Sequence, residues 1–201
     1  MRQHLFAIPI TLLLTAFCAR GQGTFVYDQQ SNTDETPQYD AGPTIQQLLP
    51  PYGQSFTPTL SSVGFIRLKL DDGNVSDGLG ATLYINLRAN SVSGTILAST
   101  DPLAMPSLFA GTTDFFFPTD VPVTAGVVYY FEPVVQSGGS WNLVTADFSY
   151  PGGSAFYEGL PLPGSDVWFR EGIVIPEPSS ALLVVVGVGA FLFVRRSRQR
   201  R

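Results

Sequence analysis

The sequence predicts an all-β domain, built as an antiparallel two-sheet sandwich that resembles a jelly roll. Short stretches rich in Val, Ile, Phe, Tyr and Thr recur along residues 22–175. Gly, Pro, Asp and Ser interrupt them about every 10 to 15 residues, as turns do between short strands. No window has the 3.6-residue apolar period of a long amphipathic helix. These three observations favour strands throughout the domain.

The clearest strand is predicted over residues 63–70, where apolar and basic residues alternate. Ile66, Leu68 and Leu70 should face the core, while Arg67 and Lys69 should face outward, because successive strand residues point to opposite sides. Residues 81–88 repeat the pattern, with Leu83, Ile85 and Leu87 inward against Thr82, Tyr84, Asn86 and Arg88 outward. Residues 71–80 between them are polar and contain glycine, which predicts a β-hairpin loop.

Eight further windows have the composition of strands: residues 24–28, 54–57, 95–99, 114–117, 127–135, 141–145, 155–158 and 167–175. Residues 127–135 are apolar on both faces, which predicts a central strand covered on both sides. Residues 29–50 and 147–166 are dense in Pro, Gly, Asn and Ser and are expected to be largely irregular.

The two ends of the chain carry targeting patterns. Residues 1–21 combine a basic start at Arg2, an apolar stretch over 5–17 and a small-x-small site at Ala19 to Gly21. This order is typical of a signal peptide that is cleaved on export. The predicted organisation is therefore a signal peptide at 1–21, a β-sandwich domain at 22–175 and a C-terminal segment at 176–201.

The C-terminal segment has three parts. Pro176, Glu177 and Pro178 precede an unbroken apolar run over residues 181–194, and the final residues include Arg195, Arg196, Arg198, Arg200 and Arg201. A helix of about 16 residues spans roughly 24 Å, somewhat less than a hydrocarbon core of about 30 Å. The arginines would hold this end in the cytoplasm, so the domain would lie across the membrane.

This ordered triplet, apolar run and arginine cluster resemble the PEP-CTERM sorting signal of Gram-negative bacteria. The resemblance covers only the tail. It implies an exosortase-like membrane enzyme as processing partner, cleavage near the triplet, and a link to exopolysaccharide and biofilm formation. The alternative is an ordinary tail anchor that follows a chance proline pair.

Without its two signals the domain is strongly acidic. Residues 22–175 hold four cations against fifteen carboxylates, a formal charge of −11. Nucleic acid is thereby disfavoured as a partner, because phosphate binding needs a positive surface. The single Cys18 and the single His4 both lie in the predicted signal peptide. A mature domain without them has no disulfide, Ser-His-Asp triad or Cys/His zinc site, while carboxylate-only enzymes such as glycosidases remain open.

A second resemblance covers most of the domain. The segments 54–58, 64–70, 94–98, 124–130 and 150–153 are similar to those of exported bacterial β-sandwich modules of unknown function, and their sandwich is similar to that of many carbohydrate-binding modules. The shared motifs are structural, so the resemblance assigns no catalytic residue.

The densest polar cluster comprises Asp71, Asp72, Asn74 and Asp77. Its oxygens could serve calcium, which prefers hard oxygen ligands, although the spacing does not match an EF-hand. The alternative is a solvated loop in which Asp, Asn and Gly adopt turn conformations. No other cofactor is predicted.

Aromatic residues gather in the last third of the domain: Trp141, Tyr150, Tyr157, Trp168 and Phe169. Exposed, these rings could form a glycan-binding platform; buried, they would fill the core or close the ends of the sandwich. For catalysis the remaining candidates are carboxylate pairs drawn from Glu132, Asp147, Glu158, Asp166 and Glu171. We therefore expect a non-catalytic structural or adhesive protein of the cell surface or matrix, with a carbohydrate- or calcium-binding module, or a carboxylate-only hydrolase, as alternatives.

Overall fold

The computed structural model describes residues 23–36, 42–47 and 51–176. Residues Thr24–Ile175 form one compact unit that contains strands and no helix among the described residues. All strand pairs are antiparallel. The predicted all-β, antiparallel class is confirmed.

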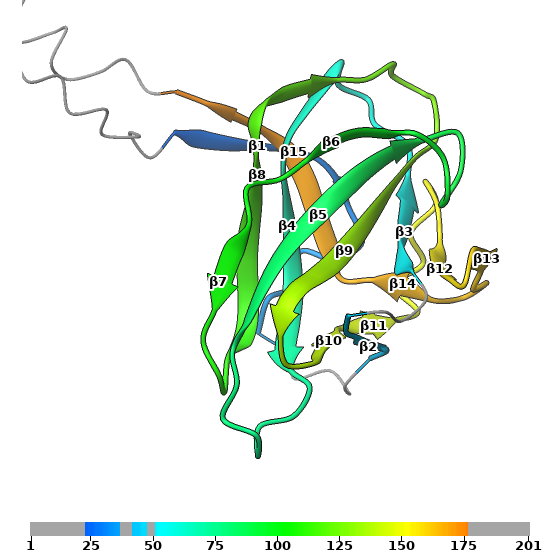
Figure 1. The fold of residues 1–201 in the computed structure, drawn as a ribbon. Coiled ribbons are helices and arrows are strands. Elements are labelled where there is room, and N and C mark those ends of the chain that lie inside the picture. The colour runs from blue at the N-terminus through cyan, green and yellow to red at the C-terminus, as the bar shows by residue number, and fades with distance from the viewer. Residues whose placement is uncertain (1–22, 37–41, 48–50, 177–201) are drawn as a thin grey trace, which may run out of the picture. The chain divides into compact units, whose positions relative to one another are not determined.

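One large sheet, sheet A, holds both ends of the unit (Figure 1). Its order is β1 (Thr24–Gln30), β15 (Phe169–Ile175), β4 (Ser62–Asp72), β10 (Trp141–Leu143) and β2 (Thr44–Ile45), and β8 (Ala110–Pro122) pairs with β4. Thr24 is the Cα partner of Ile175. The first and last strands are therefore neighbours.

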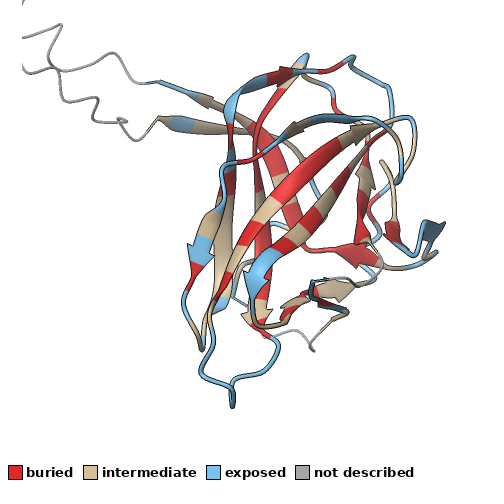
Figure 2. Cartoon of the chain, viewed as in Figure 1, coloured by how far each residue is buried: buried red, intermediate tan, exposed pale blue. Residues whose placement is uncertain are grey.

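The other large sheet, sheet B, has the order β13 (Leu160–Pro161), β12 (Ala155–Tyr157), β3 (Tyr52–Phe56), β9 (Tyr129–Gly138), β5 (Ala81–Ala89) and β6 (Ile96–Ser99). β7 (Leu103–Met105) also pairs with β5. A small third sheet joins β11 (Thr145–Ala146) to β14 (Asp166–Val167). Buried residues alternate along the first halves of β5 and β9 in Figure 2, as expected for strands with one face on the core.

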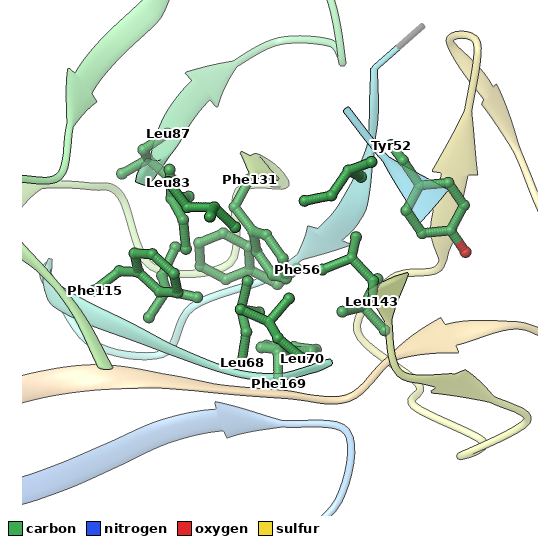
Figure 3. Packing of buried hydrophobic residues seen from close by; sticks show 14 of the residues in the cluster. Tyr52, Phe56, Leu68, Leu70, Leu83, Leu87, Phe115, Phe131, Leu143 and Phe169 are labelled. Atoms are coloured by element: carbon green, nitrogen blue, oxygen red, sulfur yellow. The ribbon is translucent and has the colours of Figure 1, made fainter. Parts of the chain in front are cut away.

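The hydrophobic core lies between the two large sheets. Figure 3 shows Leu83, Leu87 and Phe131 of sheet B facing Leu68, Leu70 and Phe169 of sheet A. The rings of Phe131 and Phe169 lie 5.2 Å apart. Because the sheets and the core are built from Thr24–Ile175, and the first and last strands pair with each other, this unit carries the interactions that it needs to fold by itself.

Ile66, Leu68, Leu70, Leu83, Ile85 and Leu87 are all fully buried in this core, as the alternation predicted. Lys69 was predicted to face outward, but it is buried. Its Nζ donates to the carbonyl oxygen of Glu35 at 2.7 Å, because residues 31–36 cross the outer face of sheet A. The alternation of residues along the strand predicts which face of the sheet carries the Lys69 side chain. It does not predict that another segment covers that face.

The predicted hairpin over residues 71–80 is wrong. β4 belongs to sheet A and β5 to sheet B, so this segment connects the two sheets instead of joining paired neighbours. Both strands direct their apolar residues into one core from opposite sides. A hairpin and a connection between sheets have the same local turn composition, and only the long-range pairing distinguishes them.

Other boundaries differ from the predictions. β8 extends far beyond residues 114–117, and the predicted strands at 141–145 and 167–175 each divide in two, at Val144 and Trp168. Val127 and Val128 are exposed and precede β9, whose second face is only partly buried. β9 is central in its sheet, between β3 and β5, but it is not covered on both faces. The short strands β2, β7 and β13 had no predicted counterpart.

Candidate functional site

The predicted aromatic platform does not form as expected. Trp141 and Trp168 are 0% exposed, and Tyr150 is buried as well. The Trp168 indole N–H donates to the Asp34 carbonyl at 3.0 Å, and the Phe169 ring packs edge-on against Tyr150 at 5.2 Å. A ring without exposed surface cannot stack on a sugar, so these residues fill the interior. Tyr157, at 39% exposure, is the exception.

The loop around Asp71, Asp72, Asn74 and Asp77 is exposed at its tip, and its polar groups make local hydrogen bonds. The Asp72 carboxylate accepts from the backbone N–H groups of Asn74 (3.0 Å) and Leu108 (2.9 Å). These bonds lower the pKa of Asp72, the one from Leu108 most, although desolvation opposes them. Asp77 accepts from the N–H of Leu79 at 2.7 Å.

Asp71 and Asp72 are adjacent on β4, so their side chains point to opposite faces. No group of three or more acidic, histidine or cysteine side chains suited to a metal occurs within residues 23–36, 42–47 and 51–176. The local bonds agree with the solvated-loop interpretation, and calcium binding stays a prediction.

Four of the five candidate carboxylates accept from neighbouring groups, and Asp147 directly follows Ala146, the Cα partner of Asp166. Glu132 pairs with Arg88 at 2.7 Å. Buried Asp166 accepts from the Gln54 amide at 2.9 Å and from the Tyr150 N–H at 3.1 Å. Asp147 accepts from the Ser149 N–H at 3.1 Å, and Glu158 is exposed in the turn after β12.

Glu171 is the most perturbed acid. It is 0% exposed, and burial raises its pKa to about 9, with the negative charge of Asp28 adding to the shift. Its Oε1 accepts from the Gln29 N–H at 3.1 Å. For Asp28, burial opposes ionisation, but hydrogen bonds from Leu60 and Thr59 bring its pKa below the ordinary value. Sequence reasoning could not predict that Asp28 and Glu171 lie close together, because they are far apart in the chain and meet only through the pairing of β1 with β15.

A cleft of about 300 Å³ opens on the outer face of sheet B. Six of its lining residues come from four segments: Ser55, Ser91, Val92, Tyr130, Ser154 and Phe156. Ser55 of β3 and Tyr130 of β9 are Cα partners, and Phe156 lies on β12 beside β3. The turn between β5 and β6 and the β12–β13 hairpin, with exposed Gly159 and Pro161, complete the lining. The two segments approach each other closely, because a Cβ atom at position 159 would lie 3.4 Å from the Val92 Cγ2.

Gly53 allows the aromatic part of this cleft to form. A Cβ atom at position 53 would lie 2.7 Å from the Phe156 ring and would also clash with the Phe131 carbonyl oxygen. Without a side chain there, the Phe156 ring lies against β3 and meets Tyr130 edge-on at 6.2 Å. Gly53 was not singled out in the sequence, since only the pairing of β3 with β12 reveals its role.

The cleft is lined without a charged side chain among the described residues. Ser55 is held in place, because its hydroxyl donates to the Ser154 carbonyl (3.0 Å) and accepts from the Ser154 N–H (2.9 Å). Arg88 of the neighbouring strand β5 is the Cα partner of Tyr130, but its guanidinium binds Glu132 and the Gly94 carbonyl. The arrangement offers aromatic and apolar walls with neutral hydroxyl groups.

The outer face of sheet A carries a different cluster, which the sequence did not predict. The Arg67 guanidinium binds Asp114 through two nitrogens, at 2.6 and 2.9 Å, and lies 5.3 Å from the centre of the Phe25 ring. Arg170 lies 3.6 Å from the centre of the Tyr27 ring. Glu35 accepts from both arginines, at 3.0 and 3.1 Å, so this cluster fastens residues 31–36 to the sheet.

The sorting motif lies almost wholly outside the described residues. Pro176 is exposed directly after β15. Glu177, Pro178, the apolar run and Arg195, Arg196, Arg198, Arg200 and Arg201 fall in the part that the structure does not describe. Within the described ranges, no helix has the length and hydropathy needed to cross a membrane. The sorting signal therefore stays a prediction.

No known protein-family profile matches the chain, and a search of curated proteins finds no significantly similar sequence.

Proposed function

We propose that this chain is an exported, non-catalytic protein of a Gram-negative-type bacterium. Its C-terminal signal directs it to the cell surface or extracellular matrix. There it acts as a structural or adhesive component. The observation that best supports this proposal is the pairing of the two ends of the domain. Thr24 and Ile175 are Cα partners, and Pro176 follows at once. The chain enters and leaves at one edge of sheet A, and among the described residues no strand pair extends before Thr24 or beyond Ile175.

The domain itself is proposed to be a jelly-roll sandwich. Among its described residues, eight strands have four or more residues: β1, β3, β4, β5, β6, β8, β9 and β15. Numbered one to eight along the chain, they lie in the orders 1-8-3-6 and 2-7-4-5 in the two sheets. Every connection between them except that from β5 to β6 changes sheet, which agrees with the double Greek key of a jelly roll.

The carboxylates support a non-catalytic role. A glycosidase needs two carboxyl groups that reach opposite sides of the bond it cleaves. Glu171, the acid with the most raised pKa, is fully buried beside Asp28 and cannot touch a polysaccharide. Glu132 forms an ion pair with Arg88, and Asp166 accepts hydrogen bonds from Gln54 and Tyr150.

Fractionation of a bacterium that contains an exosortase tests the sorting. We expect the wild-type chain in the surface or matrix fraction, and a chain lacking residues 176–201 in the soluble exported fraction. The Glu177→Gln variant, which keeps the apolar run and the arginines, should accumulate in the inner membrane. If Glu177→Gln distributes like the wild type, the tail is a plain anchor and the sorting proposal fails.

A further inference from the structure

We propose that the cleft between Tyr130, Phe156 and the β5–β6 turn binds a neutral sugar unit of a polysaccharide. This proposal rests on the adhesive role above and names the class of ligand that the domain would hold. It differs from the aromatic platform predicted from the sequence, because that set of residues is mainly buried.

The shape and walls of the cleft suit a pyranose ring. Its volume of about 300 Å³ lies at the lower end of the range for small-molecule sites. The Tyr130 and Phe156 rings meet at an interplanar angle of 65°. Phe156 is only 2% exposed and supports the Tyr130 ring, so partly exposed Tyr130 and Val92 supply the apolar surfaces of the cleft. A sugar ring presents apolar C–H faces to such walls and directs its hydroxyl groups to the side.

The cleft is lined by residues with hydroxyl groups that could form hydrogen bonds with a sugar. Ser91 and Ser154 line the cleft together with the phenol of Tyr130. Among the described residues, no hydrogen bond is recorded for the Tyr130 hydroxyl, whereas the Ser55 hydroxyl is fully engaged by Ser154. A hydroxyl can both donate and accept, which matches the mixed character of sugar hydroxyls.

Charge selects against anionic ligands. The nearest cation, Arg88, is already paired with Glu132 at 2.7 Å and bonded to the Gly94 carbonyl at 2.9 Å. The domain as a whole carries a formal charge of −11, which repels anions approaching from solution. A neutral polysaccharide therefore fits the cleft better than a uronic-acid polymer.

Affinity electrophoresis and calorimetry of the 22–175 domain test the proposal, with dextran, mannan and cellohexaose as neutral probes and alginate as the anionic one. We expect at least one neutral probe to bind and alginate not to bind. Tyr130→Ala and Val92→Trp should each weaken that binding by about tenfold or more, the first by removing a wall and the second by filling the cleft. Tyr84→Ala is the matched control, since Tyr84 is a partly exposed tyrosine of sheet B outside the cleft, and it should leave binding unchanged.

Thermal melts of each variant separate loss of binding from loss of folding. Val92→Trp, at a partly exposed turn residue, provides a second test if Tyr130→Ala unfolds. The proposal is overturned if no neutral probe binds the folded domain, if alginate binds equally well, or if both cleft variants retain full binding. None of these outcomes affects the fractionation result, so the sorting proposal and the sugar proposal can fail independently.

Discussion

At the scale of single residues, folding shifts the pKa of Glu171 strongly. Its carboxyl is fully buried beside Asp28 and accepts from the Gln29 N–H of β1 through Oε1. An ionised carboxylate in such a place would be costly, so the protonated form is favoured and the pKa rises to about 9 from an ordinary 4.5. Asp28 stays ionised nearby because Leu60 and Thr59 donate to it.

The raised pKa predicts a specific dependence of stability on pH. Below pH 4.5 Glu171 is protonated in both the folded and unfolded chain and costs nothing. Between 4.5 and about 9, unfolding releases a proton, so the free energy of unfolding falls as pH rises, by at most about 1.4 kcal/mol per unit. Glu171→Gln, which keeps an uncharged side chain, should remove this slope and be more stable than the wild type at pH 8.

Urea unfolding at pH 5, 6.5 and 8 measures the effect, with Glu158→Gln as control because that acid is exposed. The difference between Glu171→Gln and the wild type should grow with pH, while the control should run parallel to the wild type. A constant difference across the three pH values would contradict the burial of an uncharged Glu171.

At the scale of elements, residues 31–36 show how an irregular segment is held on a sheet. Glu35 accepts from Arg67, Arg170 and the Thr112 hydroxyl, which come from β4, β15 and β8. Burial opposes its ionisation, but these bonds bring the pKa of Glu35 below its usual value. The segment also covers Lys69 and Trp168 through the carbonyl groups of Glu35 and Asp34.

Glu35→Ala should loosen this segment without unfolding the sandwich. Because the ion pairs are partly exposed, we expect a loss of only about 1 kcal/mol in the free energy of unfolding. Hydrogen exchange followed by mass spectrometry should show faster exchange in residues 31–36 and unchanged exchange in β5 and β9. Asp101→Ala removes an equal charge from an exposed site and is the control; equal protection in the two variants would contradict the anchoring role of Glu35.

The same scale shows what the sequence could reveal. Each of the ten predicted strands falls on a strand of the structure, because side-chain alternation and turn residues are local signals. The hairpin over residues 71–80 was wrong because pairing is decided by distant strands such as β8 and β9. The cleft was missed for the same reason, since Ser55, Tyr130 and Phe156 come together only through sheet B. The sequence shows the aromatic residues in the last third of the domain, but it does not show that most of them are buried.

At the scale of the whole molecule, the ends of the domain and its charge agree with an exported cargo. The first and last strands pair, so the predicted signals lie outside a unit that has its own core. The acidic surface of that unit would keep it soluble after release. The proposed cleft lies on sheet B, whereas both ends of the unit belong to sheet A. A chain attached through its end could therefore still present the cleft to a polysaccharide.

The most direct test of the proposed sorting is the C-terminal mass of the mature protein, isolated from bacteria that contain an exosortase. Top-down mass spectrometry reads both termini of the chain in one measurement. The proposal predicts a new C-terminus near Pro178 and the absence of Arg201, with Ile175 and the rest of β15 retained. A mature chain that still ends at Arg201 would contradict processing and leave a simple membrane anchor.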